Sequence, residues 1–317
     1  MSIVSAFTSA ILPILAIMGL GYLLSETLDI ALKPLNDVAL YAFLPALVFH
    51  NLATTSLGGA VLLKVVMGVV AFVAAMWTVA EVVGRTAEIA EPFRSADVLA
   101  AMFPNAGFYG VPLAAFAFGE AGRTTAILWM TLQSFLMYTV GVYVASRGGG
   151  ETGWGAVGSV FRLPLIYAIL LALIARVADV VPSETGVAMQ TVQMIGEASI
   201  PLMLVVVGIR LAEMEHTSFS GAISPSVLRL FVAPAVALAV ALALAFDDPT
   251  IARTFVVLSA TPVAVVPLAL VITYSDDPGR DGRAASEHLT TTIFVTTLAS
   301  VPVLTVLITV MQSGAIV

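Results

Sequence analysis

The sequence predicts an all-α polytopic membrane protein, on the evidence of its apolar content, its scarcity of charge and the lengths of its apolar runs. Of 317 residues, 60% are hydrophobic and 10% are charged. About a quarter of a typical soluble domain is charged. Lipid must therefore cover most of the apolar surface. This composition excludes a nucleic-acid-binding protein and a cytosolic enzyme, and the absence of cysteine excludes a disulfide scaffold.

Ten apolar runs follow one another, each close to the roughly 20 residues that a spanning helix needs. They cover residues 4–24, 35–53, 59–83, 96–119, 122–146, 160–180, 187–211, 225–246, 251–274 and 286–313. The longest break between them, residues 148–159, is rich in glycine and is typical of a flexible linker. We expect this linker to join two halves of five helices, residues 1–147 and 160–317.

Basic residues in the loops and helix ends predict the orientation of the chain in the plasma membrane. If both termini lie outside, nine basic residues lie at the inner face and four at the outer face. The inner set is Lys33, Arg85, Arg94, Arg147, Arg162, Arg210, Arg229, Arg280 and Arg283, and the outer set is Lys64, Arg123, Arg176 and Arg253. We therefore expect the N- and C-termini outside.

Three pairs of similar segments indicate an internal repeat. Because each half has an odd number of helices, a duplicated half would be inverted in the membrane, as in many transporters. The pairs are residues 44–47 with 200–203, 61–64 with 226–229, and 111–114 with 266–269.

The fourth and ninth runs are interrupted at corresponding places. The fourth has Pro104, Gly107, Gly110 and Pro112 near its centre, and the ninth has prolines at 262 and 267. Proline removes a backbone donor, and a broken backbone in a membrane must be satisfied by protein or a watery cavity. Each break starts a half-helix whose N–H groups carry about half a positive charge. Two facing starts predict an anion site without a cationic side chain, whereas a simple proline kink is the alternative.

The motif Pro104-Asn105-Ala106-Gly107-x-x-Gly110-x-Pro112 resembles the fourth-helix signature of the auxin efflux carrier family, whose prokaryotic members include malate and malonate permeases. Further segments resemble that family's helices in the same order along nearly the whole chain. They are residues 44–49, 162–166, 201–208, 229–234 and 261–264.

The resemblance implies a five-plus-five inverted-repeat carrier of small organic anions with an elevator mechanism. It implies a scaffold from the first, second, sixth and seventh helices, through which a homodimer could form, and a transport domain from the others. By the same resemblance, Asn105 contacts a substrate carboxylate where the fourth and ninth helices cross. The ninth-helix asparagine of plant members is missing, and Ser259 and Thr261 stand in that region.

We therefore predict a substrate site at the two interruptions and the adjoining fifth helix. Gln133 either lines the cavity or bonds a neighbouring helix. The predicted residues are Asn105, Gly107, Tyr109, Gly110, Pro112, Gln133, Ser259, Thr261, Pro262 and Pro267.

Candidate coupling residues are Glu197, His50 and Asn51, because ionisable groups inside a membrane are functional candidates. The alternatives are an ion pair or helix cap for Glu197 and a solvated interfacial side chain for His50. Lys64 and Arg229 either attract anions or extend to the membrane surface. We expect no cofactor and no metal site. Proton coupling is favoured over sodium, because the ninth run lacks the carboxylate with which the related sodium/bile-acid symporters bind sodium.

The function that the sequence predicts is secondary transport of a small carboxylate, with substrate and lipid as its partners. The alternatives are a sodium-coupled organic anion symporter of the bile-acid type, or a channel or sensor on the same fold. A membrane enzyme is disfavoured, because the acidic cluster at residues 276–281 contains a Pro-Gly turn rather than helical spacing.

Overall fold

A computed structural model describes residues 3–28, 30–54, 59–147, 164–213, 221–275 and 284–314, and the regular elements within these ranges are helices. Short π-helical turns, labelled η, continue the α-helices beside them. The elements are α1 Ile3–Ala6, η1 Phe7–Ile11, α2 Leu12–Thr27, α3 Leu32–Val38, η2 Ala39–Phe43, α4 Leu44–Thr54, α5 Gly59–Thr86, α6 Phe93–Met102, η3 Ala106–Gly110, α7 Val111–Leu136, η4 Met137–Gly141, α8 Val142–Ser146, α10 Pro164–Val177, α11 Val187–Glu213, α12 Ile223–Val227, η5 Leu228–Val232, α13 Ala233–Leu244, α14 Pro249–Ser259, α15 Val266–Tyr274 and α16 Ala285–Gln312. The expected linker at 148–159 lies outside the described residues.

Seven helical stretches within the described residues are long and apolar enough to cross a membrane, against the ten that the sequence predicts. The difference arises at the interrupted runs. The ninth run forms two short helices, α14 and α15, and only residues 164–177 of the sixth run form the described helix α10. The chain is nevertheless a multi-pass helical membrane protein.

One of the seven stretches, Ala106–Ser146, is 41 residues long, about twice the length that one crossing requires. Gly119 divides it, with a φ of 65° and a ψ of −147° inside α7. Glycine adopts this backbone conformation without the steric cost that a Cβ would add. The chain therefore turns at Gly119, between the runs predicted at 96–119 and 122–146.

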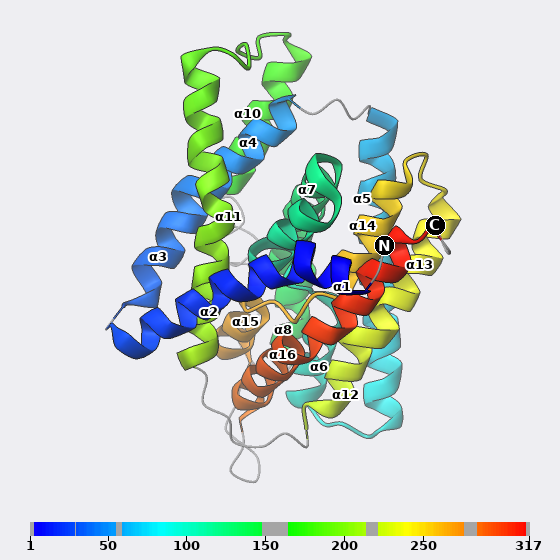
Figure 1. The fold of residues 1–317 in the computed structure, drawn as a ribbon. Helices are drawn as coiled ribbons and strands as arrows, with labels where there is room; N and C mark the ends of the chain where they lie inside the picture. The colour runs from blue at the N-terminus through cyan, green and yellow to red at the C-terminus, as the bar shows by residue number, and fades with distance from the viewer. Residues whose placement is uncertain are drawn as a thin grey trace.

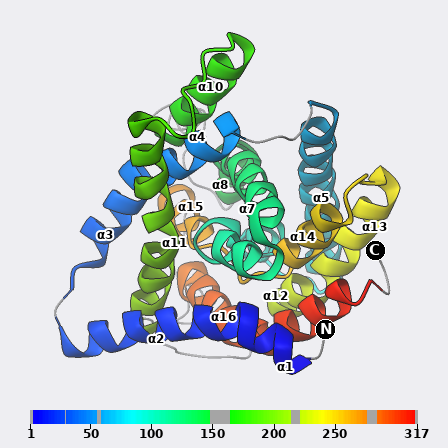
Figure 2. The same cartoon turned by 45° about the horizontal axis from the view of Figure 1, so that its top comes forward.

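The helices pack in two groups. In the first, α11 contacts α2, α3 and α4, and α10 contacts α4; in the second, α5 contacts α6, α7 and α13, and α16 contacts α6 and α14. Figure 1 shows the first group on the left and the second on the right, and Figure 2 shows α7 between them. Both α4 and α11 contact α7, so α7 joins the two groups.

Glycine allows the closest approach within the first group. A Cβ on Gly208 of α11 would collide with the carbonyl oxygen of Met18 on α2, and one on Gly21 of α2 would collide with that of Val205. Small residues let membrane helices pack backbone against backbone, where dispersion contacts replace the hydrophobic effect. A side chain at either glycine would therefore separate α2 from α11.

An ion-pair network fastens the ends of α5, α6 and α8 to one another. Arg147 Nη2 lies 2.8 Å from Glu81 Oε2 and 2.9 Å from Glu91 Oε1, and Arg94 Nη2 lies 2.8 Å from the same Glu91 oxygen. Burial alone would raise the pKa of Glu91, but hydrogen bonds from Ser95, Arg147 and Arg94 outweigh it and hold the pKa below its ordinary value. Glu91 is therefore ionised at neutral pH and stabilises this end of the second group.

Candidate functional site

The two interruptions that the sequence predicts lie side by side. The Asn105 N–H donates to the Pro262 carbonyl over 2.7 Å, and the Ala264 N–H donates to the Phe103 carbonyl over 3.0 Å. Pro104 and Val263 form an antiparallel bridge between these bonds. The broken segments thus satisfy part of each other's backbone, as an interruption at membrane depth requires.

Gln133 of α7 gives the Pro104 carbonyl at the first interruption a second donor, beside the Ala106 N–H at 2.7 Å. Its Nε2 donates to the Pro104 carbonyl over 2.7 Å, and its Oε1 accepts from Trp129 Nε1 over 2.8 Å. At the second interruption, the Thr296 hydroxyl accepts from the Val263 N–H over 3.2 Å. Gln133 thus bonds a neighbouring segment, and it also lines the cavity described next.

A cavity of about 500 Å³ lies against both interruptions. This volume falls within the range typical of small-molecule sites. Asn105, Ala106 and Gly107 line it where η3 begins, and Ala264, Val265 and Val266 line it where α15 begins. The first turns of these helices have N–H groups without intrahelical partners and a partial positive charge. This wall of the cavity is therefore suited to an anion.

Another part of the lining comes from the first helix group and contains an arginine. Asn36, Tyr41 and Arg210 line the cavity from α3, η2 and α11. Arg210 Nη2 donates to Asn36 Oδ1 over 3.2 Å, and the guanidinium has no carboxylate within ion-pair distance in the described part of the chain. The acidic residue of this part of the lining, Asp37, is paired with Lys33, with Oδ2 and Nζ 2.6 Å apart.

Sequence reasoning missed Arg210 as a site residue, because it counted the residue only among the inner basic side chains. A usable signal was present, since Arg210 is the only charged residue among positions 198–212 of the seventh run. The sequence predicts an anion site without a cationic side chain, whereas an arginine lines the same cavity as the two half-helix starts.

Three of the ten predicted substrate residues line the cavity, namely Asn105, Gly107 and Gln133. The other seven do not line it and belong to the interruptions and the helices beside them: Tyr109, Gly110, Pro112, Ser259, Thr261, Pro262 and Pro267.

The surroundings of four of these residues explain why they do not line the cavity. Tyr109 is fully buried, with its hydroxyl 3.5 Å from Ser300 Oγ on α16. A Cβ on Gly110 would approach Leu258 to 2.8 Å. Pro267 stands in the first turn of α15, where proline costs no helical hydrogen bond, and Pro112 stands where η3 continues into α7.

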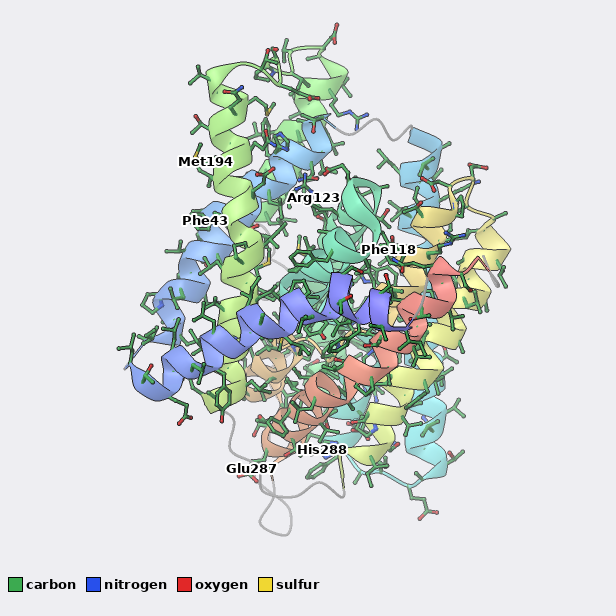
Figure 3. The ribbon with its side chains drawn as sticks, in the orientation of Figure 1. Phe43, Phe118, Arg123, Met194, Glu287 and His288 are labelled. Atoms are coloured by element: carbon green, nitrogen blue, oxygen red, sulfur yellow. The ribbon has the colours of Figure 1, made fainter. Side chains whose placement is uncertain are left out.

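The candidate coupling residues lie near one end of the first helix group, away from the cavity lining. Half of the Glu197 side chain is exposed, its Oε1 accepts from Gln193 Nε2, and Arg123 Nη1 lies 4.0 Å away. Asn51 is buried and donates to the Leu47 carbonyl, and His50 is half-buried. Figure 3 shows Arg123, the neighbour of Glu197, in the upper half of the molecule, far from His288 at the start of α16. Glu197 therefore lies beside Gln193 and Arg123, and the three candidate coupling residues do not line the cavity.

Lys64 and Arg229, which correspond in the predicted repeat, occupy different environments. Lys64 reaches the surface and binds the Ala245 carbonyl and Asp247. Arg229 is fully buried, so the prediction that it extends to the membrane surface is wrong for this residue. Its guanidinium donates instead to backbone carbonyls of α6 and α14.

A family model described as "Membrane transport protein" matches residues 6–153 and 157–308 of the chain. The chain belongs to this family. The family comprises auxin efflux carrier and malate permease-like proteins, so the resemblance noted from the fourth-helix motif is confirmed. Its members are transporters rather than enzymes.

Similar proteins carry transporter names. The chain is 27% identical over 274 residues to a protein of Methanothermobacter thermautotrophicus named "Uncharacterized transporter", covering 84% of this chain and 88% of the relative. It is 25% identical over 320 residues to a Rhizobium meliloti protein named "Putative malonate transporter", covering 98% of this chain and 97% of the relative. The likeness thus extends over nearly the whole chain.

Proposed function

We propose that this protein is a secondary carrier of small organic anions and that its substrate is a dicarboxylate. The cavity beside the paired interruptions carries this proposal. Its lining includes the half-helix starts at Ala106 and Val266 and the guanidinium-bearing side chain of Arg210. Half-helix N-termini that point at a substrate carboxylate are a recurring feature of transporters.

The size of the cavity and its two positive features, the half-helix starts and Arg210, favour a substrate with two carboxylates over a substrate with one. A first carboxylate would accept hydrogen bonds from the N–H groups at the start of η3 and from Asn105. A second would bind the guanidinium of Arg210, whose planar fork matches a carboxylate. The relative named for malonate supports a short dicarboxylate as the first candidate.

A second cavity, of about 490 Å³, lies between α13 and α16 and is unsuitable for this role. Leu230, Phe231 and Pro234 line it with other apolar side chains. An anion placed there would lose its hydration without gaining a hydrogen-bond donor.

The mechanism that we propose is alternating access by relative movement of the two helix groups. We interpret α6 with η3 and the first part of α7 as one broken crossing, and α14 with α15 as the other. This reading yields ten crossings in a five-plus-five inverted repeat. The group of α2, α3, α4, α10 and α11 would serve as the scaffold, and the group containing both interruptions would carry the anion.

Coupling, membrane placement and assembly are further parts of the proposal. We propose proton coupling, with both termini on the outer side of the plasma membrane and a homodimer formed through the scaffold group. A carrier that imports or exports an anion must balance its charge, and each elementary charge moved is worth about 2.3 kcal/mol per 100 mV.

Uptake by proteoliposomes tests the proposal. We expect saturable uptake of radiolabelled malonate or succinate, dependent on the pH gradient, with acetate as a weak competitor. Sodium and choline buffers should give equal rates. Uptake that rises linearly with substrate concentration would indicate a channel, and the absence of uptake of any short carboxylate at either pH would refute the proposal.

A further inference from the structure

Arg229 is a fully buried arginine that forms no ion pair within the described residues. Its Nη1 donates to the Ala101 carbonyl over 2.7 Å, and its Nη2 donates to the Ser259 carbonyl. The guanidinium carbon lies 5.6 Å from the centre of the Phe72 ring. An unpaired buried charge is costly, so the carbonyls and the ring must compensate it.

The two carbonyls belong to the C-terminal ends of the two half-helices that precede the interruptions. α6 ends at Met102, and α14 ends at Ser259. The last carbonyls of a helix lack partners within it. In α14, the carbonyls of Val257 and Leu258 accept from N–H groups of the following turn over 3.1 Å. The Ser259 carbonyl accepts from Arg229 Nη2 instead.

The positive charge of the Arg229 guanidinium balances the partial negative charges of the two helix C-termini that it contacts. Each helix C-terminus carries about half a negative charge, and each N-terminus about half a positive charge. The C-terminal ends of α6 and α14 together thus present about one negative charge to a single guanidinium. Beyond the interruptions, the starts of η3 and α15 present about one positive charge to the cavity.

We propose that Arg229 is a built-in cation that neutralises both half-helix C-termini and so maintains the positive potential of the anion site. This inference rests on the proposed function only where it concerns the anion. Arg229 does not line the cavity, so it is a positioning residue that acts through the backbone of both interruptions.

Two features distinguish this role from ordinary packing. Arg229 Nε has no hydrogen-bond partner among the described residues, so only the two terminal nitrogens are used. The corresponding residue Lys64 lies at the surface and pairs with Asp247. One buried cation can serve both half-helices, because their C-terminal ends meet at the same point.

Removal of the guanidinium would leave a space beside two backbone carbonyls. Carbonyl oxygens are ligands for small cations, and a free guanidinium ion has the shape of the missing group. We therefore expect R229A to be less stable than the wild type and to be stabilised by guanidinium chloride at millimolar concentration, with choline chloride as the salt control. Wild type and the matched surface variant K64Q should show no such response.

This stability assay requires no substrate, so it tests Arg229 separately from the transport proposal. An R229A protein whose melting temperature responds equally to guanidinium and choline would overturn the inference. If R229A does not fold, R229Q takes its place in the same assay, because its shorter side chain also leaves room for the ion.

Malonate uptake tests whether the charge of Arg229 maintains the positive potential of the anion site. R229K keeps the charge but cannot bridge two carbonyls in the same way, and R229Q is neutral. We expect R229Q to raise the KM for malonate about tenfold, equivalent to about 1.4 kcal/mol, with R229K and K64Q staying within about threefold of the wild type. Equal changes in R229K and R229Q would show that shape alone matters and would contradict the inference. If wild type takes up no carboxylate, the proposed function fails, and the stability assay still decides the role of Arg229.

Discussion

The interruption after α6 and the interruption after α14 bond to each other, yet they contribute different things to the cavity. The first brings the polar side chain of Asn105 and the start of η3 at Ala106 and Gly107, where the Ala106 N–H already donates to the Pro104 carbonyl over 2.7 Å. The second brings the apolar residues Ala264, Val265 and Val266.

The hydroxyls of the second interruption stay within the protein. Thr261 Oγ1 donates to the Leu258 carbonyl over 2.8 Å, and Thr296 Oγ1 accepts from the Val263 N–H. The side-chain part of anion recognition is therefore concentrated on the first interruption, and the second supplies the start of α15, backbone support and apolar shape. The predictions below test this division, from the largest expected effect to the smallest.

Replacing Gln133 by leucine should have the largest effect on stability. The change leaves the buried Trp129 N–H without its acceptor, at about 1–3 kcal/mol, and the Pro104 carbonyl keeps only the Ala106 N–H as a donor. We expect a loss of about 1–3 kcal/mol, seen as a lower melting temperature in detergent. The variant Ser134→Ala is the control, because its hydroxyl bonds only its own helix at the Met130 carbonyl. Equal melting temperatures for the two variants would contradict the role given to Gln133.

Replacing Arg210 by glutamine should weaken anion binding about tenfold to thirtyfold. A hydrogen bond to a charged group contributes about 1.5–3 kcal/mol, and this guanidinium has no carboxylate of its own among the described residues. Calorimetry with malonate measures the change, with Arg210→Lys expected between glutamine and wild type. A dicarboxylate should lose more affinity than a monocarboxylate, and equal losses for both would remove Arg210 from the site.

Replacing Thr296 by valine should cost about 1 kcal/mol of stability and leave malonate affinity unchanged. The substitution removes the acceptor of the Val263 N–H at the second interruption, and Thr296 does not line the cavity. Melting temperature and affinity are measured on the same preparation. A large loss of affinity would show that the second interruption takes part in recognition as well.

The smallest effect is expected from Glu91→Gln, at the ion-pair network far from both interruptions. Because the folded state holds the pKa of Glu91 below its ordinary value of 4.5, the stabilisation is present above that value and is lost as the pH falls through the folded pKa. We expect the variant to be about 1 kcal/mol less stable at pH 7, with the difference shrinking in acid. A difference that grows on acidification would contradict the ion pairing.

The sequence predicted the interruptions because proline and glycine act locally. Pro104 and Pro262 lack a backbone N–H donor however the helices pack, and Gly119 stands at the predicted boundary of two runs. The family resemblance at residues 104–112 was equally local, and the family comparison confirmed it.

The long-range parts of the site could not be predicted in this way. Arg210 and Arg229 are alike as basic residues near helix ends, yet one lines a cavity and the other is buried between two helix termini. That difference depends on the packing of α11 and η5 against distant segments. Pro267 stands in the first turn of α15, a place that sequence patterns alone do not distinguish from a ligand contact.

The central claim is that the anion binds at the first interruption, and calorimetric titration of malonate into purified Asn105→Ala and Thr261→Val tests it most directly. Asn105 lines the cavity, and Thr261 is buried behind it with its hydroxyl bound to the Leu258 carbonyl. The account predicts that Asn105→Ala weakens binding about a hundredfold, or 2.7 kcal/mol, while Thr261→Val keeps the wild-type affinity. Wild-type affinity in Asn105→Ala, together with lost binding in Thr261→Val, would contradict it.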